Sequence, residues 1–443
     1  MNTQLKLIQL ILLLNCLSTL CSATSASSNP IFIDQKLNHS DPFDSQSFKQ
    51  QYFFEASFAE NNQAPVFFYL CGEEGCSLNH GIIQESAQKN KGYMIALEHR
   101  YFGRSSPFSE FTTKNLKYLT VDNAIEDAAD FIRKIKIEKG LTGPWISMGG
   151  SYSGILSALL RQRHPELVVG ALASSAPINA QDFIPNYDKS LAKTVGPDCA
   201  AKILKVTESV ELALKSDQAR EVKLRFGAED LTDETDVLSW LADIAAGAVQ
   251  YGKKDHFCSL LNTSDPMNAF SQYAIKLEKM VGWSALNNEV EGLLDPKAPL
   301  RAWPYLICTQ LGGWQIANPD RKLSIRSEKL NADHAYRACR QLFGIEFNPH
   351  LDEWKKNIYL PILNPATTNI LFTHGTEDPW LAFGISEVNE NATNPNITTF
   401  LIHGVGHTSD FEWSNPSDSK ELVQARLLFQ KKIEEWTSSK ASK

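Results

Sequence analysis

The sequence predicts an α/β fold in which a mostly parallel sheet is interrupted by a large, mainly helical insertion. Three observations support this prediction. Short apolar runs alternate with helical patterns over residues 30–180, helical patterns dominate residues 181–365, and two further apolar runs with a final long helix complete the chain. Strands that alternate with helices favour parallel pairing through crossover helices.

The first part of the chain predicts four buried strands and two helices. The strand-like runs are short and mostly apolar, and they lie at residues 64–71, 92–100, 143–150 and 167–177. Residues 121–140 place apolar side chains at helical spacing and end at Gly140. Residues 155–165 form a second expected helix, which Pro165 closes.

The middle part changes character, and it is too long to be a loop. Its helical patterns lie at residues 199–216, 237–252 and 271–283. The last part predicts two strands ending at glycine and a long amphipathic helix, at residues 368–375, 397–404 and 419–439. This order is that of an α/β-hydrolase fold, and we expect a core of residues 24–180 and 366–443 around a cap of residues 181–365.

The composition and the N-terminus limit the classes of function that the protein can have. The chain has 443 residues and a formal net charge of −8, and it contains no block of basic residues, so we expect no nucleic-acid partner. Lys6, a short apolar run and the stretch Cys21–Ala23 predict a cleaved signal peptide at residues 1–23. Later apolar runs are too short to predict a membrane span.

The cysteines and sequons agree with export. After the signal peptide an even number of cysteines remains, which favours disulfides in an exported chain: Cys71, Cys76, Cys199, Cys258, Cys308 and Cys339. Proximity favours Cys71 with Cys76 and Cys308 with Cys339. The chain has no CxxC pair and no histidine cluster near its cysteines, so we expect no metal and no cofactor. Expected glycosylation sites are Asn38, Asn262, Asn391 and Asn396. We expect a secreted, lysosomal or vacuolar protein.

Residues 147–154 read SMGGSYSG and join a predicted strand to a predicted helix. A nucleophile on such a turn needs small neighbours, because the backbones approach closely. Ser151 follows Gly149 at the right spacing, and Ser153 stands where a strict Gly-x-Ser-x-Gly pattern has glycine. We therefore predict that Ser151 is the nucleophile and that the N–H of Tyr152 stabilises an oxyanion. The alternative is an ordinary turn with a helix-capping serine.

A serine nucleophile needs a base, and the base needs an orienting acid. In this fold the acid and then the histidine follow the serine along the chain. Asp378 lies directly beyond one late predicted strand, and His407 lies in a glycine-flanked loop beyond the next. Glu377 and His403 are the neighbouring alternatives, and Asp410 and Asp418 come too late in the chain order to be the favoured acid. We predict the triad Ser151, Asp378 and His407.

The loop after the first apolar run is the expected source of a second oxyanion donor. Gly72 and Glu73 are the candidates there. Glu73 and Glu74 are also candidates to bind a substrate amine, although solvated acids in a turn are the common case. An apolar substrate pocket has three candidate tryptophans, each of which has core packing as its alternative role: Trp303, Trp314 and Trp380.

Several stretches resemble one family of exported serine peptidases, which includes lysosomal Pro-Xaa carboxypeptidase, dipeptidyl peptidase II and thymus-specific serine protease. The matching stretches are FIDQKLNHSDP (32–42), EHRYFGRSSPF (98–108), YLTVDNAIEDAADFI (118–132), 149–178, CTQLGGWQ (308–315), HGTEDPW (374–380) and GHTSD (406–410). The resemblance places the family's nucleophile on Ser151, its acid on Asp378 and its base on His407. The chain departs from the family pattern at Ser153 and Thr408.

The resemblance implies a serine exopeptidase that cleaves peptides near a terminus, after proline or a similar small apolar residue, through an acyl-enzyme. It leaves open whether the enzyme is a carboxypeptidase or a dipeptidyl peptidase. An esterase or lipase shares the fold and is the second hydrolase reading, and a silent binding protein is the alternative outside catalysis. The expected partner is a peptide substrate, and a homodimer remains open.

Overall fold

The computed structural model describes residues 31–73, 75–281, 284–389 and 394–438. The expected signal peptide, residues 1–23, lies outside them. The described residues form one eight-stranded sheet in the order β1-β2-β4-β3-β5-β6-β7-β8. The strands are β1 (Ile31–Lys36), β2 (Ser47–Glu55), β3 (Val66–Leu70), β4 (Tyr93–Leu97), β5 (Trp145–Gly150), β6 (Gly170–Ser174), β7 (Ile370–Gly375) and β8 (Thr398–Ile402).

The sheet is mostly parallel, as the sequence predicts. Strand β4 pairs parallel with β3, and parallel pairing continues through β5, β6 and β7 to β8. Strands β1 and β2 add an antiparallel edge that the sequence analysis did not predict, because their polar residues break the apolar runs that mark buried strands. Parallel strands end at one edge, so the loops that follow β3, β5, β7 and β8 meet there.

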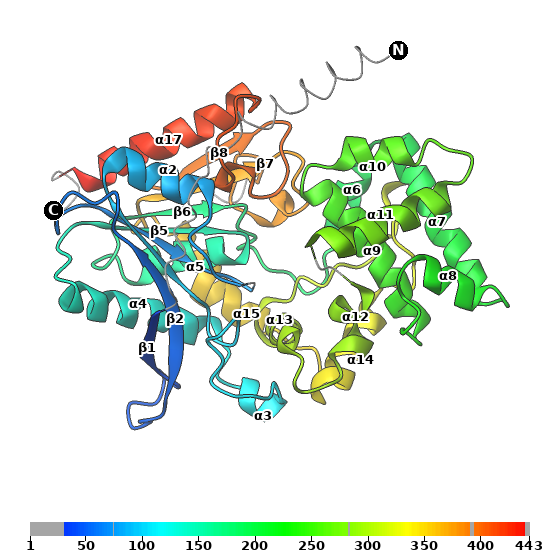
Figure 1. Cartoon of the computed structure of the whole chain (residues 1–443), viewed down its shortest axis with the longest axis horizontal. Helices are drawn as coiled ribbons and strands as arrows, with labels where there is room; N and C mark the ends of the chain where they lie inside the picture. Colours follow the sequence, from blue (N-terminus) through cyan, green and yellow to red (C-terminus); the bar gives the residue numbers. More distant parts are fainter. Residues whose placement is uncertain (1–30, 74, 282–283, 390–393, 439–443) are drawn as a thin grey trace, which may run out of the picture.

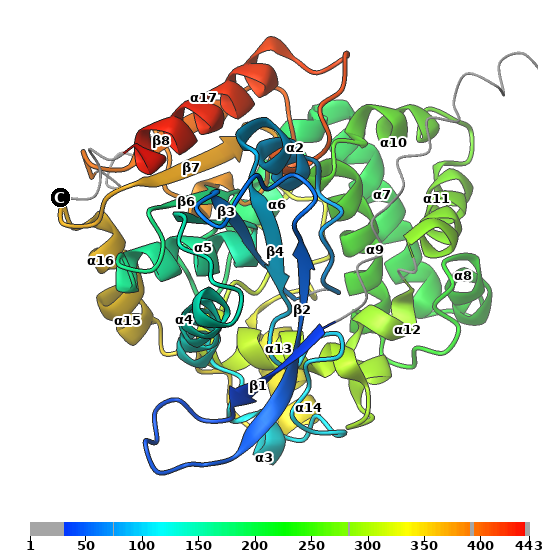
Figure 2. The same ribbon diagram turned by 60° about the vertical axis from the view of Figure 1, so that its left-hand side comes forward.

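Helices cover both faces of the sheet (Figures 1 and 2). Helices α4 (Val121–Glu138) and α5 (Tyr152–Arg163) share a hydrophobic core with Phe68 and Trp145 on one face. Helices α2 (Gly81–Asn90) and α17 (Lys420–Thr437) pack on the other face, around Phe67 and Met148. The short helix α3 spans Thr113–Leu116. The alternating strands and helices thus build a three-layer core.

Between β6 and β7 the named elements are all helical. The α-helices are α6 (Pro185–Val195), α7 (Pro197–Leu214), α8 (Ala219–Arg225), α9 (Glu234–Gln250), α10 (Lys254–Leu260), α11 (Pro266–Val281), α12 (Ala285–Asn288), α13 (Ala302–Leu306), α14 (Ala332–Phe343), α15 (Leu351–Trp354) and α16 (Leu360–Leu363). The 3-10 and π segments here are η1 (Val290–Leu293), η2 (Pro299–Arg301), η3 (Ile307–Leu311), η4 (Arg321–Leu323) and η5 (Lys355–Tyr359). After β7 come η6 (Leu381–Phe383) and η7 (Ser409–Phe411).

This helical region divides between two hydrophobic cores. Most buried side chains from Ile184 to Ala285 form a core of their own, which Ile325 and Phe383 join. In contrast, side chains from Val290 to Ile362 pack into the larger core of the sheet and helices α4 and α5. Helices α6 to α11 accordingly stand to one side of the sheet in Figure 1. Within the described residues, no helix is long and apolar enough to cross a membrane.

Candidate active site

Ser151 lies on the turn between β5 and α5, at the carboxyl edge of the sheet. Its φ of 59° and ψ of −130° are rare for a residue with a side chain, so the turn is strained. Its N–H donates to the carbonyl oxygen of Ser174 at 2.8 Å, and its carbonyl oxygen accepts from the N–H of Gly154 at 2.9 Å. These bonds hold the backbone in the conformation typical of a nucleophile elbow.

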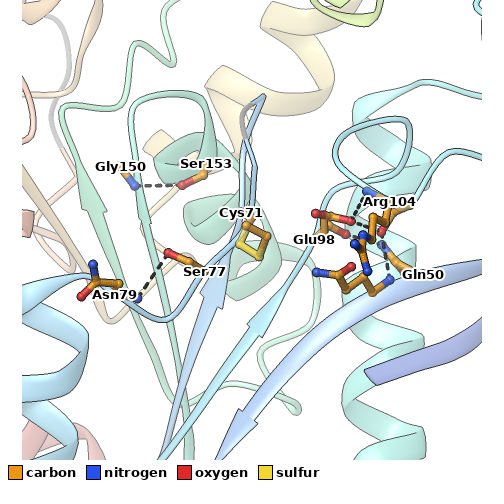
Figure 3. Close-up of a disulfide and its surroundings, with 11 residues drawn as sticks. Gln50, Cys71, Ser77, Asn79, Glu98, Arg104, Gly150 and Ser153 are labelled. Atoms are coloured by element: carbon orange, nitrogen blue, oxygen red, sulfur yellow. Dashed lines mark hydrogen bonds between the residues drawn. A yellow bond between two sulfur atoms is a disulfide. The ribbon is translucent and has the colours of Figure 1, made fainter. Parts of the chain in front are cut away.

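The turn leaves no space for larger neighbours. A Cβ atom added to Gly149 would lie 2.0 Å from the carbonyl oxygen of Ser153, so the close approach requires glycine. The Ser153 hydroxyl accepts a hydrogen bond from the N–H of Gly150 at 2.9 Å (Figure 3). Ser153 therefore does more than substitute for a glycine, because its side chain closes the turn that carries Ser151.

His407 and Asp378 form a buried pair. The Nδ1 atom of His407 lies 2.8 Å from Oδ2 of Asp378, and only 5% and 2% of the two residues' surfaces are exposed. The N–H of Trp380 donates to Oδ1 of Asp378 at 2.9 Å. Burial acts to raise the pKa of Asp378, but the charge and hydrogen bond of His407 outweigh it and keep that pKa below its usual range. The carboxylate is thus ionised and oriented toward the imidazole.

The loop that carries His407 lies against the serine turn. A Cβ atom on Gly150 would lie 3.0 Å from Cγ2 of Thr408, and the N–H of Thr408 donates to the hydroxyl of Ser175 at 2.9 Å. Among the described residues, no hydrogen bond joins the Ser151 hydroxyl to His407. Such bonds are often long in a resting enzyme and tighten when substrate binds.

A disulfide-closed loop covers the start of helix α5. Cys71 and Cys76 are bonded, with their Cα atoms 5.5 Å apart (Figure 3). Between them, a Cβ atom on Gly72 would lie 3.4 Å from Cβ and 3.6 Å from the backbone nitrogen of Ser153. Gly72 is therefore beside the first turn of α5, whose first residue is Tyr152. Two of the three oxyanion candidates, Tyr152 and Gly72, therefore lie next to the serine turn.

Glu98 holds this loop to the sheet. Its carboxylate accepts hydrogen bonds from the N–H of Arg104 at 2.8 Å and from the hydroxyl of Ser105 at 2.7 Å (Figure 3). Burial raises the pKa of Glu98, and hydrogen bonds from Ser105 and from the backbone of Arg104 and Cys76 oppose that rise. The carboxylate therefore connects the disulfide loop to the segment after β4.

Glu73 and Glu74 are the two acidic candidates in this loop. Glu73 is half-buried and follows Gly72, which lies beside the first turn of α5. Burial, and next the negative charge of Glu73, raise the pKa of the Tyr152 hydroxyl. Glu74 lies outside the described residues, so Glu73 is the one of these two acids whose surroundings the structure describes.

Two of the three candidate tryptophans contact residues of the site. The ring of Trp303 packs edge-on against Tyr152, with centroids 5.5 Å apart. Trp380 donates its backbone N–H to Asp378, and its ring packs against Tyr187 at 4.9 Å. Trp314 instead packs its ring against His334, with centroids 5.6 Å apart.

Two residues of the site, His99 and Gln250, escaped the sequence analysis as functional candidates, and Asp410 was set aside there as the acid because of its late place in the chain. His99 accepts or donates a hydrogen bond with the Tyr152 hydroxyl at 3.1 Å, and its place within EHRYFG is the signal that could have found it. Asp410, within GHTSD, accepts from the hydroxyls of Ser174 at 2.5 Å and Thr373 at 2.7 Å. Gln250 contacts both triad loops, and nothing in its local sequence indicates this.

The cysteines of the described chain form disulfides, as their even number predicts. The bonds are Cys71–Cys76, Cys199–Cys258 and Cys308–Cys339. Of the sequon asparagines, Asn262 and Asn396 are exposed and Asn38 is half-exposed, whereas Asn391 lies outside the described residues. The described residues include no group of three or more histidine, cysteine or acidic side chains arranged to hold a metal ion.

Comparison with known proteins places this geometry in context. A family model described as serine carboxypeptidase S28 matches residues 35–429. The chain is 33% identical over 410 residues to a protein named probable serine protease EDA2 from Arabidopsis thaliana, with 87% of this chain and 81% of that protein covered. It is 26% identical over 463 residues to lysosomal Pro-X carboxypeptidase of Mus musculus, covering 94% and 90%.

Among solved structures, proline iminopeptidase from Mycobacterium smegmatis shows a TM-score of 0.44 at 12% sequence identity. The match covers 91% of this chain and 100% of that chain.

Proposed function

The chain belongs to the serine carboxypeptidase S28 family and is a serine-type peptidase, and from that premise we propose that Ser151, His407 and Asp378 are its catalytic triad. The observation that carries the proposal is the strained backbone of Ser151 at a strand-to-helix turn, beside a loop whose histidine is bonded to a buried aspartate. A capping serine in an ordinary turn needs neither the strain nor the aligned pair.

In the proposed reaction, the Ser151 hydroxyl oxygen attacks the carbonyl carbon of the scissile peptide bond, and Nε2 of His407 accepts the hydroxyl proton. Asp378 holds Nδ1–H and stabilises the imidazolium. The N–H of Tyr152 and the loop at Gly72 stabilise the negative oxygen of the tetrahedral intermediate. His407 then gives its proton to the leaving amine, and water, activated by the same histidine, hydrolyses the acyl-enzyme.

We propose an exopeptidase that cleaves after proline or a similar small apolar residue. Two observations support this specificity. The mouse relative is named a Pro-X carboxypeptidase, and the partly exposed ring of Trp303 packs against Tyr152 beside the serine turn, which makes Trp303 our candidate wall of an apolar pocket. We also propose a roof over the site, formed by the helices whose side chains make the separate core from Ile184 to Ala285. This roof would admit only the ends of peptides.

The direction of cleavage depends on how the peptide terminus is held. Glu73, whose charge acts on Tyr152 next to Ser151, is a candidate partner for the amine of a dipeptidyl substrate. A carboxypeptidase instead needs a cation or N–H groups for the terminal carboxylate. Peptides with proline at the cleaved position, blocked at one end or the other, separate the two: loss of cleavage on N-terminal blocking means a dipeptidyl peptidase, and loss on C-terminal blocking means a carboxypeptidase.

The triad is tested with the exported chain and its Ser151→Ala variant. We expect the wild type to cleave Pro-containing peptides and to be labelled by a fluorophosphonate, and the variant to do neither. Equal peptide cleavage by both proteins would contradict the proposal. Comparison of acyl esters with peptides tests the esterase reading, which predicts that esters are hydrolysed far faster.

For the location of the protein, we propose secretion or delivery to a lysosome or vacuole. Three disulfides in the described chain and a relative named lysosomal support this proposal.

A further inference from the structure

The carboxyl end of helix α9 touches the loop that carries His407. The carbonyl oxygen of Gln250, the last residue of α9, accepts the backbone N–H of His407 at 2.8 Å. A Cβ atom on Gly406 would lie 2.4 Å from the same oxygen, so this contact requires a glycine there. The last carbonyl groups of a helix have no partner within the helix, which leaves this one free to accept.

The side chain of the same residue touches the loop that carries Asp378. Its Oε1 atom accepts a hydrogen bond from Nε1 of Trp380 at 3.0 Å and another from the Tyr187 hydroxyl at 2.9 Å. One amide oxygen has two lone pairs and can accept both. Trp380 in turn donates its backbone N–H to Asp378. Gln250 is thus bonded to the histidine loop through its backbone and to the aspartate loop through its side chain.

We propose that Gln250 is a positioning residue, which sets the alignment of His407 with Asp378 from outside the sheet. The two loops follow different strands, β7 and β8. Helix α9 packs in the separate hydrophobic core, through side chains such as Leu241 and Val249. The helical region is therefore part of the scaffold of the triad, in addition to any role as a roof. This inference rests on the proposed triad.

A nearby ion pair shows that α9 and α10 meet the acid loop at more than one point. Nζ of Lys254 lies 2.6 Å from Oε1 of Glu377, the residue before Asp378, and both side chains are about one-fifth exposed. A partly exposed pair of this kind contributes little on its own. The shared amide oxygen of Gln250 is therefore the contact that we expect to fix the geometry.

The test substitutes Gln250 and measures kcat and KM separately. Gln250→Met keeps the size of the side chain and removes the acceptor, so Trp380 and Tyr187 lose their common partner; we expect kcat to fall about ten-fold and KM to change less than about two-fold. Fluorophosphonate labelling of Ser151 should slow in parallel. Gln250→Glu retains an acceptor oxygen and should recover kcat to within about three-fold of wild type.

Gln430→Met is the matched control. Gln430 lies on α17, and its side-chain amide forms hydrogen bonds with Ser86 and Asn90 of α2. This variant therefore loses a comparable buried amide and should keep wild-type kcat.

If Gln250→Met does not fold, Gln250→Asn takes its place. The shorter side chain withdraws the amide by one methylene, and we expect the same loss of kcat. A wild-type kcat and labelling rate in these variants, or an equal defect in Gln250→Glu, would overturn the inference. A Ser151→Ala protein that stays active would instead refute the triad itself.

Discussion

The hydroxyl oxygen of Ser153 lies 2.9 Å from the backbone nitrogen of Gly150 and accepts its hydrogen bond across the turn that carries Ser151. Ser153 is buried, and it stands where the family pattern has glycine. A glycine at this position offers no acceptor, so the chain has added a bond to a turn that is already strained at Ser151. We therefore expect the Ser153 hydroxyl to hold closed the turn that carries Ser151, the proposed nucleophile.

Ser153→Ala removes this bond without adding bulk. We expect the free energy of unfolding to fall by about 1 kcal/mol and kcat to fall several-fold, because the turn that presents Ser151 becomes looser. Urea unfolding and steady-state kinetics measure the two effects. Ser157→Ala is the control: Ser157 lies on the same helix and bonds Ser147 at 2.9 Å, so it should lose similar stability with unchanged kcat. An unchanged kcat in Ser153→Ala as well would contradict this role.

Two buried aspartates in neighbouring loops should respond differently to amidation. Asp378→Asn preserves the size of the side chain but cannot stabilise the imidazolium, so we expect kcat to fall on the order of 10³- to 10⁴-fold. Asp410→Asn disturbs the bonds to Ser174 and Thr373, and should lower the free energy of unfolding by about 1–3 kcal/mol while keeping most of kcat. The reverse order of kcat losses would identify Asp410 as the acid.

Removal of disulfides should separate stability from catalysis. Replacing Cys199 and Cys258 with alanine opens a span of 59 residues and should cost about 4 kcal/mol of stability, with little change in kcat. Replacing Cys71 and Cys76 opens a span of 5 residues and should cost only about 2 kcal/mol, yet lower kcat, because Gly72 loses its fixed place beside Tyr152. Chemical unfolding and kcat of both double variants test this. Equal kcat in the two would show that the loop does not assist the reaction.

Buried histidine should make the fold less stable in acid. Burial lowers the pKa of His374 to about 4, and its ring nitrogens have no hydrogen-bond partner among the described residues. The unfolded chain has the ordinary pKa of about 6.5 and so binds the proton more readily between the two values. The stabilising effect of the neutral ring is therefore complete above pH 6.5 and is lost as the pH falls toward 4.

His374→Asn should remove this dependence. Between pH 7 and pH 5 the wild type should lose about 2 kcal/mol more of its free energy of unfolding than the variant loses. Urea unfolding followed by tryptophan fluorescence at both pH values measures the difference. The same substitution at His403, whose side chain is exposed, is the control. Parallel losses in wild type and His374→Asn would show that His374 does not contribute to the acid sensitivity.

The parts of the fold that were predictable are those whose signal is local. The apolar runs that became β3 to β7 are mostly buried on both faces, so each is visible in a few consecutive residues. The edge strands β1 and β2 lacked this signal, because IFIDQK and SFKQQYFFE mix polar and apolar residues. The helical region was visible as helices, but its division between two cores depends on which side chains meet, and helical spacing does not contain that information.

The candidate triad was predictable for a topological reason. In a parallel sheet the carboxyl ends of the strands meet at one edge, so a serine, an acid and a histidine that each follow a strand are brought together by the order of the strands alone. Chain order and strand ends thus point to Ser151, Asp378 and His407.

The contacts that support these residues were decided by tertiary structure. Gln250 meets His407 across 157 positions of the chain, and Glu98 meets the disulfide loop through backbone atoms, which have no sequence signature. The sequence by itself determined the mostly parallel sheet with its helical insertion, the chemistry available at the sheet edge and the family. Only the folded chain decided which distant backbone groups hold that chemistry in place, because hydrogen bonds between remote segments form only where packing brings unpaired donors and acceptors together.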